Sequence, residues 1–187
     1  MNVPALTNKN LLKPVSFKRA LRIATAVGAL VLLLLLIYRI YNIYQLSVQK
    51  IYQESYVPYR IAQGPVADTT MFTTIEMYYA EGKFNEVVKL SKGLLSVTDR
   101  ERLLIGISYL QKEEYLPAIS WLKRLADVEN TPYQQVAEYY LTLTHLQNED
   151  FDRTIELMQH ITEDNSHPYQ KRFTPKMIKE VQLLKWK

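Results

Sequence analysis

Side chains that could carry acid–base or metal chemistry are few in this chain of 187 residues, and their spacing is unfavourable. His145, His160 and His167 are its three histidines, the side-chain type that most readily titrates near neutral pH. The last two do not match the His-x-x-x-His or His-Glu-x-x-His spacing that places two ligands on one helix face. The absence of cysteine excludes thiolate metal sites and disulfides. The sequence therefore predicts no metal site.

Motifs for nucleophilic catalysis or phosphate binding are also missing from the sequence. The five glycines stand singly at positions 28, 64, 82, 93 and 106, so they form no glycine-rich phosphate loop. No Gly-x-Ser-x-Gly motif occurs. The acidic residues fall mostly in predicted turns and on polar helix faces, where paired carboxylates for acid–base catalysis are not expected. We therefore expect no enzyme activity, no cofactor and no small-molecule substrate.

The strongest signal is an apolar run near the N-terminus. Residues 23–38 (IATAVGALVLLLLLIY) are sixteen uncharged residues, and no later part of the chain is large enough to bury them. As a helix they span ~24 Å, and the apolar residues flanking them extend this toward the ~30 Å of a bilayer core. The sequence predicts one transmembrane helix over residues 20–40, preceded by a basic tail over residues 1–19.

A cleaved secretory signal is the alternative, because it too has a basic start and an apolar middle. Such a signal needs small residues after the apolar run, whereas here YRIYNIYQL follows. Tyr38, Tyr41 and Tyr44 are typical of the aromatic belt at a membrane interface. The retained anchor is the favoured interpretation.

Basic residues are distributed unevenly around the apolar run. Five precede it, at positions 9, 13, 18, 19 and 22, and only Arg39 and Lys50 follow before Glu54, the first acidic residue. Positive charge is retained in the cytoplasm, so we expect a cytoplasmic N-terminus and an exported C-terminal domain. Without those five charges the chain carries 18 basic and 19 acidic side chains, so its net charge of +4 gives no reason to expect nucleic acid.

Three stretches downstream align as helix–turn–helix units, at residues 69–96, 100–132 and 136–161. A single hairpin cannot bury both faces of its amphipathic helices, so such units stack on their neighbours. The predicted fold class is all-α, with a transmembrane helix and helical stalk, then three repeats over residues 69–165 as a short α-solenoid, and a capping helix. Three columns carry the alignment, with spacings of 31 and 36 residues: Tyr78, Tyr109 and His145; Phe84, Tyr115 and Phe151; and Val87, Ala118 and Thr154.

The repeat resembles the tetratricopeptide repeat (TPR) superfamily, whose period is 34 residues. The middle copy carries the resemblance, with Gly106 where two helices approach closely, then Tyr109, Tyr115, Ala118 and Pro132. The overall architecture is similar to that of membrane-anchored TPR proteins of bacterial envelopes. The resemblance implies a single-pass protein of the bacterial inner membrane with a periplasmic, protein-binding domain.

The resemblance also implies a concave binding face made by the first helix of each repeat. An apolar and aromatic groove suits a helix or an extended peptide, but the stalk or the capping helix could fill it instead. Chaperone-binding TPR modules hold a C-terminal carboxylate with lysines and asparagines that this face lacks, so that partner class is disfavoured. The expected groove residues are Phe72, Glu76, Tyr79, Leu103, Ile107, Leu110, Gln111, Tyr139, Leu143, Leu146 and Gln147.

Two further segments complete the predicted organisation. Residues 41–68 carry a tyrosine-rich stripe at helical spacing, which predicts a stalk continuing the transmembrane helix and then a linker at residues 63–65. We favour packing of this stripe within the chain over packing on a partner. Thr174 and Pro175 begin a last helix over residues 174–187, interpreted as a cap on the final repeat. Asp99 and Thr131 are expected N-caps.

The function that this organisation favours is a membrane-anchored scaffold or accessory subunit of an envelope complex for secretion, assembly or motility. The alternative is a translocon-associated, chaperone-like TPR protein that contacts exported polypeptides, because that family has the same topology. A membrane signal transducer is less favoured, since residues 1–19 are too few for an effector domain. No sequence feature identifies the partner or the oligomeric state.

Overall fold

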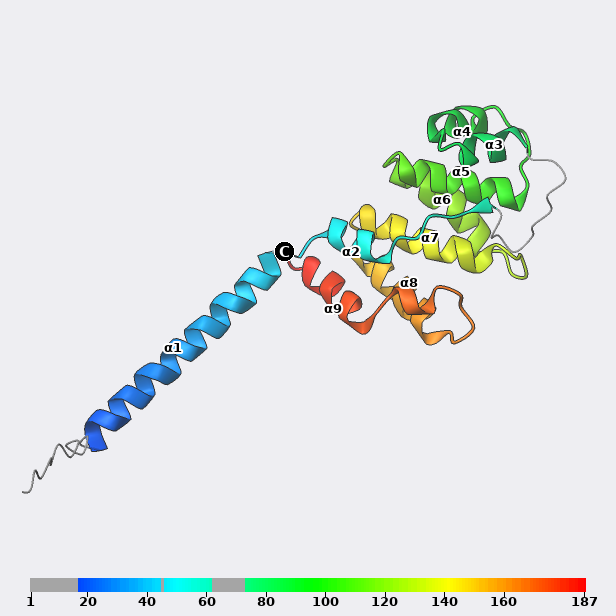
Figure 1. Cartoon of the computed structure of the whole chain (residues 1–187). Coiled ribbons are helices and arrows are strands. Elements are labelled where there is room, and N and C mark those ends of the chain that lie inside the picture. Colours follow the sequence, from blue (N-terminus) through cyan, green and yellow to red (C-terminus); the bar gives the residue numbers. More distant parts are fainter. Residues whose placement is uncertain (1–16, 45, 62–72) are drawn as a thin grey trace, which may run out of the picture. The chain divides into compact units, whose positions relative to one another are not determined.

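The computed structural model describes residues 17–44, 46–61 and 73–187 (Figure 1). Over these residues all regular secondary structure is helical, which confirms the expected all-α class for this part of the chain. The chain divides into two compact units, the first ending at Gln45 and the second beginning at Leu46. Each unit is described by itself.

The first unit contains one long helix, α1 (Phe17–Tyr44), of 28 residues. Its segment Ala24–Tyr41 is long and apolar enough to cross a membrane, and none of that segment is buried within the chain. Among the described residues no other helix has these properties. The apolar helix expected over residues 20–40 is confirmed as a helix of sufficient length and composition.

Three helical hairpins form most of the second unit: α3 (Thr74–Ala80) with α4 (Phe84–Ser91), α5 (Asp99–Gln111) with α6 (Tyr115–Ala126), and α7 (Gln134–Gln147) with α8 (Phe151–Glu163). Each of these helices contacts the next one in sequence, and α5 also contacts α3 and α7. The first helices of the three hairpins therefore lie side by side and form a common face.

The three hairpins close with the same backbone turn. Each turn contains one residue in the left-handed region: Gly82 at φ 71°, Glu113 at φ 60° and Glu149 at φ 58°. The backbone N–H of the next residue bonds to the carbonyl five positions earlier, at 2.8, 3.0 and 3.0 Å respectively, as in a Schellman motif. These positions are 31 and 36 residues apart, the same spacings that align the units in sequence. The local structure thus repeats in register with the sequence.

Local capping explains where α5 begins. Thr98, and not the expected Asp99, caps α5, because its hydroxyl accepts the Glu101 N–H at 3.2 Å and the Glu101 carboxylate accepts the Thr98 N–H at 2.9 Å. The N-cap of α7 is Tyr133 rather than Thr131. Both expected boundaries were wrong by one or two residues, the usual uncertainty of helix ends.

Helices α5 and α6 approach each other closely at Gly106 on α5. A Cβ atom there would lie 2.7 Å from both Cγ and Cδ2 of Leu122 on α6, and Leu122 is fully buried. A glycine is therefore needed for α5 and α6 to approach this closely. This gives a packing reason for the small residue that the sequence places here.

The segment after α1 is not the continuous helical stalk that the sequence predicts. Helix α1 ends at Tyr44, Ser47 caps a separate helix, α2 (Val48–Ser55), and the chain is then extended over residues 56–60. Helix α2 contacts α7 and α9, and its Ile51 is fully buried. The tyrosine-rich segment therefore packs within the chain, as the favoured interpretation has it.

The second unit ends with the short 3-10 turn η2 (Gln170–Arg172) and the helix α9 (Pro175–Leu184). Thr174 caps α9 by accepting the backbone N–H of Met177 at 3.2 Å. Helix α9 contacts α8 and α2, and its apolar stripe is buried. A helix therefore covers the last hairpin in the region where the sequence predicts a cap.

Candidate binding groove

The residues expected to line a groove come together on the face of α3, α5 and α7, but that face is covered. Phe72 lies outside the described residues. Gln111 and Gln147 are half-buried, and the other predicted residues are buried. The buried ones are Glu76, Tyr79, Leu103, Ile107, Leu110, Tyr139, Leu143 and Leu146.

The cover is the chain itself, in part through residues 46–61, here named the groove segment, while Tyr169 and Phe173 pack on the ring of Tyr139. In Figure 1 this segment is cyan, and its part beyond α2 runs alongside α7. Gln111 on α5 donates from Nε2 to the hydroxyl of Tyr56 at 3.0 Å, and Gln147 on α7 donates to Gln49 Oε1 at 3.3 Å. An external partner can reach the predicted groove residues only if the groove segment leaves. Their role in partner binding stays a prediction.

Tyrosine hydroxyls hold the extended part of the groove segment by its main chain. Tyr139 donates to the carbonyl oxygen of Ser55 at 2.5 Å and accepts the N–H of Val57 at 3.0 Å. Tyr140 donates to the Val57 carbonyl oxygen at 2.5 Å. The Tyr79 hydroxyl donates a longer bond, of 3.3 Å, to the carbonyl oxygen of Tyr59. Because these bonds reach backbone atoms, they are compatible with many side-chain sequences in the bound segment.

The same tyrosines pack as an aromatic cluster. Tyr139 stacks on Tyr169, with ring centroids 3.9 Å apart, and Tyr140 meets the ring of Tyr59 edge-on at 6.4 Å. Such pairs stabilise a core by about 0.5–1.5 kcal/mol beyond the area they bury. Burial raises the pKa of Tyr79, Tyr139 and Tyr140 well above the ordinary value. Their hydroxyls therefore remain protonated donors at physiological pH.

Glu76, one of the predicted groove residues, has a structural role in α3. Its Oε2 accepts the N–H of the N-cap residue Thr73 at 2.7 Å, and its Oε1 pairs with Arg100 Nη1 on α5 at 2.8 Å. Arg100 Nε donates in turn to the Tyr133 hydroxyl at 3.2 Å, and the hydrogen bond to Glu76 contributes most to a raised pKa of Arg100. The capping-box spacing from Thr73 to Glu76 was the sequence signal for this role.

A cleft of about 340 Å³ remains open beside the extended part of the groove segment. Its walls, as far as the structure describes them, are mostly proline and aromatic rings, and they include the exposed cationic side chain of Arg60. Among the described residues that line it, none is acidic or a histidine. The lining residues are Val57, Pro58, Tyr59, Arg60, Pro132, Gln135, Val136, Pro168 and Tyr169.

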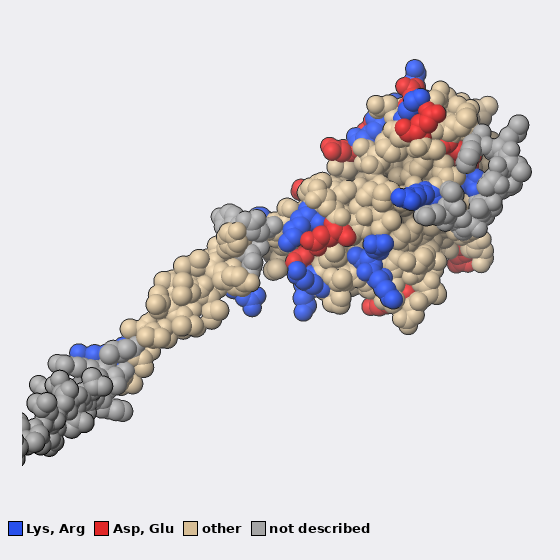
Figure 2. Space-filling view, in the orientation of Figure 1, with Lys and Arg blue, Asp and Glu red and all other residues tan. Residues whose placement is uncertain are grey.

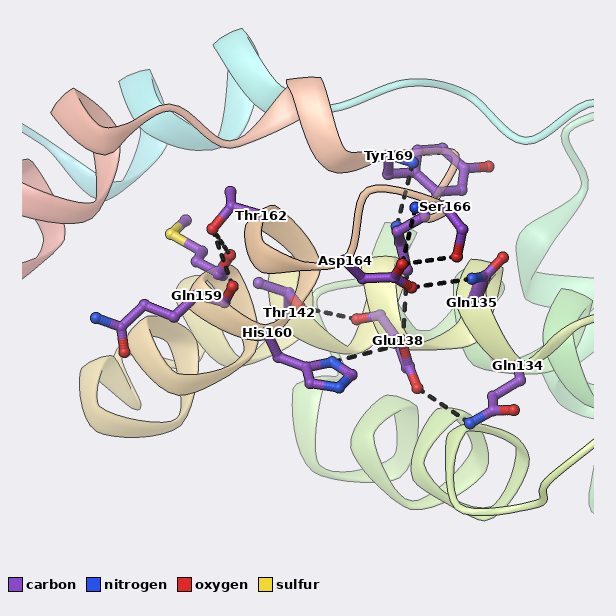
Figure 3. Close-up of polar contacts among 12 residues, drawn as sticks. Gln134, Gln135, Glu138, Thr142, Gln159, His160, Thr162, Asp164, Ser166 and Tyr169 are labelled. Atoms are coloured by element: carbon purple, nitrogen blue, oxygen red, sulfur yellow. Dashed lines mark hydrogen bonds and ion pairs between the residues drawn. The ribbon is translucent and has the colours of Figure 1, made fainter.

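A polar cluster joins α7 to α8 and the loop after it (Figure 3). Glu138 is 8 % exposed, and its Oε2 lies 3.5 Å from His167 Nε2 and 3.9 Å from His160 Nδ1. His167 Nδ1 accepts the N–H of Tyr169 at 3.2 Å, so a neutral ring carries its proton on Nε2, which makes no hydrogen bond among the described residues. The His167 side chain is fully buried, which keeps substrates from this pair.

The loop of this cluster is also ordered by Asp164, whose carboxylate accepts the backbone N–H and the hydroxyl of Ser166 at 2.8 and 2.6 Å. Those bonds lower the pKa of Asp164, and Gln135 on α7 donates to it at 3.3 Å. No local sequence pattern indicates this convergence, because the cluster joins residues from separate elements of the chain. Its geometry supports a structural role that positions Tyr169 against the groove face.

Within the described ranges, no group of three or more histidine, aspartate or glutamate side chains is placed to hold a metal ion. Comparison with known proteins gives no relative: no family model, no curated protein and no solved structure matches this chain.

Proposed function

We propose that this chain is a membrane-anchored scaffold without enzyme activity, which binds a protein partner through a TPR-like module. Three observations support a module of this kind. The hairpins close with equivalent turns at Gly82, Glu113 and Glu149, their first helices share one face, and Gly106 permits the close crossing of α5 and α6. Stacked hairpins of this type present extended surfaces to other proteins.

The groove segment is the observation that carries the proposal. It begins at Leu46, five residues after the end of the candidate span at Tyr41, and it is built into the core of the second unit. The module is therefore connected to the anchor through a packed segment, with little chain between them. A short connection of this kind suits a scaffold that presents a partner close to a membrane.

We place the partner at the open cleft beside Tyr59, Arg60 and Tyr169. Rings and prolines on its walls favour an apolar side chain, and the exposed guanidinium favours a carboxylate nearby. The partner chemistry that fits is an extended peptide carrying an apolar residue next to an acidic one. In this proposal the covered groove residues act indirectly, by holding the groove segment that forms one wall.

The proposed location is the bacterial inner membrane, with the N-terminus in the cytoplasm and the second unit in the periplasm. The excess of basic residues before the apolar run supports this orientation. A fusion tests this orientation: a reporter enzyme is attached after Lys187, and this enzyme is active only outside the cytosol. Activity is the expected result, and an inactive fusion that is stably produced contradicts the orientation.

A chaperone-like protein that contacts exported polypeptides is the second candidate. It is favoured by one observation, namely that Tyr139 and Tyr140 bind main-chain atoms, which every polypeptide offers. This function requires the groove segment to leave the face of α3, α5 and α7. An exported polypeptide would then take its place by the same backbone bonds.

Site-specific photo-crosslinking in the native membrane distinguishes the two candidates. The crosslinker replaces Arg60 at the cleft in one protein and Lys89, an exposed residue on α4, in the matched control. A scaffold gives one or a few defined adducts at position 60 that also co-purify in mild detergent. A chaperone gives many adducts with newly exported chains. Adducts that are equal at the two positions would refute the cleft as the partner site.

A further inference from the structure

The exposed face of α9 is unusual for a helix that only caps a core. Lys176, Lys179 and Leu183 follow one another at helical spacings of three and four residues, so they lie along one stripe, and Trp186 lies in the turn that follows the helix. Leu183 is 48 % exposed and Trp186 is 85 % exposed. The buried stripe of α9 lies on another face, so these large apolar side chains contribute little to the core.

The same end of the chain is strongly basic. Residues 171–187 contain six lysine or arginine residues and one acidic residue, Glu180. That carboxylate lies 3.7 Å from Lys176 Nζ, and Lys185 Nζ pairs with Asp152 on α8 at 2.5 Å, which still leaves an excess of positive charge. Figure 2 shows blue side chains, with red ones among them, over the part of the surface where Figure 1 places α9. Tryptophan and lysine close together on one surface are typical of segments that lie at a membrane interface.

Chain connectivity limits how far this face can lie from the candidate membrane span. Lys187 Nζ donates to the carbonyl oxygen of Leu46 at 3.1 Å, so the C-terminal end of α9 lies at the start of the second unit. From Tyr41 the helix continues for three residues to Tyr44, and two further residues lead to Leu46. At the rise of a helix and the length of an extended chain, these five residues separate Tyr41 from Leu46 by about 12 Å at most. The interfacial zone of a bilayer is itself about 7 Å deep on each side.

We propose that the C-terminal end of α9 docks onto the anionic lipid surface of the membrane that α1 crosses. Trp186 and Leu183 enter the headgroup region, while Lys176 and Lys179 pair with lipid phosphates. The inference rests on the anchoring part of the proposed function. It adds a second attachment to the membrane, which fixes the orientation of the module and hence the direction in which its cleft faces.

Tryptophan fluorescence of the full chain in vesicles tests this docking. The protein is reconstituted into phosphatidylcholine vesicles with or without phosphatidylglycerol, and brominated acyl chains serve as quenchers. The fluorescence of Trp186 is obtained as the difference between the fluorescence of the wild type and that of Trp186→Phe, a variant in which Trp121 is the only tryptophan. Because Trp186 is exposed, the substitution should not disturb the fold. We expect quenching of Trp186 in the anionic vesicles, and its loss at high salt.

Removal of positive charge gives the matched comparison. Lys176→Gln with Lys179→Gln should weaken docking about fivefold for each lysine removed. Lys89→Gln with Lys92→Gln removes the same charge from the region of α4 and should leave docking unchanged.

Anchoring is measured separately, by flotation of the vesicles after alkaline washing. The docking is contradicted if the protein floats but Trp186 stays unquenched. It is also contradicted if the protein floats and Trp186 is quenched equally in the two kinds of vesicle. In both cases the anchoring by α1 is still supported. Protein that fails to float overturns the anchor, and the docking with it. If Trp186 is shielded only in the purified complex with a protein partner, the lipid assignment is also wrong.

Discussion

The hydroxyl of Tyr140 donates a hydrogen bond to the carbonyl oxygen of Val57, 83 residues earlier in the chain, at 2.5 Å. This bond and its neighbours from Tyr139 connect the third hairpin to the segment that directly follows α1. The predicted groove is thus filled by a segment of its own chain, bound in the way that an extended peptide would be.

Removing those hydroxyls should release the groove segment. Tyr139→Phe with Tyr140→Phe keeps the rings but leaves the buried carbonyl of Ser55 and the half-buried N–H and carbonyl of Val57 without these partners, at a cost of up to about 1–3 kcal/mol for each group. We expect faster amide hydrogen exchange over residues 55–59 and a lower free energy of unfolding. Tyr115→Phe is the control, because no hydrogen bond to its hydroxyl is found among the described residues. Unchanged exchange in the double variant would contradict this role of the hydroxyls.

Leu143→Ala distinguishes a core residue from a surface one at a predicted groove position. The side chain is fully buried, so its truncation should lower the free energy of unfolding by about 2–5 kcal/mol. Leu116→Ala on α6 is the matched control, because Leu116 is 71 % exposed and should change stability by less than about 0.5 kcal/mol. Denaturant unfolding of the full chain in detergent measures both. A small effect of Leu143→Ala would mean that the groove segment leaves this face readily.

Gly106→Ala should destabilise the second unit although alanine favours helix. Its Cβ would lie 2.7 Å from atoms of the buried Leu122, and such overpacking costs about 1–3 kcal/mol against a gain in helix preference of about 1 kcal/mol. We expect a lower midpoint of thermal unfolding. At Gly93 the nearest atom to a new Cβ is 3.8 Å away, so Gly93→Ala should have little effect. Equal effects of the two substitutions would show that the crossing of α5 and α6 can relax.

At the left-handed positions of the equivalent turns, substitution to glycine and substitution to alanine should change the free energy of unfolding in opposite directions. Glu149→Gly removes the strain of a side chain at φ 58° and should raise the free energy of unfolding by up to about 1 kcal/mol, whereas Gly82→Ala at φ 71° should lower it by a similar amount. Asn148 has φ −80°, so Asn148→Gly gains nothing and serves as the control. Differential scanning calorimetry measures all three. A loss of stability in Glu149→Gly would contradict the shared turn conformation.

His145 should make the second unit sensitive to acid. Burial lowers its pKa below the usual value of about 6.5, although the Asp150 carboxylate lies 3.0 Å from Nδ1 and opposes this shift. The unfolded chain therefore binds more protons than the folded one just below pH 6.5, so stability should fall as the pH drops through that range. Denaturant unfolding at several pH values measures the slope. His145→Gln should reduce the slope, and an unchanged slope would assign it to other groups.

The amino-acid sequence alone determined the local elements of this protein. The apolar run of α1, the 3.6-residue periodicity of the hairpins and the turn positions at Gly82, Glu113 and Glu149 depend on neighbours within a few residues. Their signals can therefore be read along the chain. The small residue at Gly106 was also predictable, since its position within the repeat indicates a close helix crossing.

Tertiary structure alone decided what occupies the groove. The contact of Tyr140 with Val57 and the convergence of His160 and His167 on Glu138 join residues from separate elements, and no local pattern encodes their distance. The tyrosine-rich stripe after α1 could have continued as a free stalk. It is instead interrupted at Ser47 and folds onto α7, because this buries Ile51 and the tyrosine rings and satisfies the backbone groups of the extended segment.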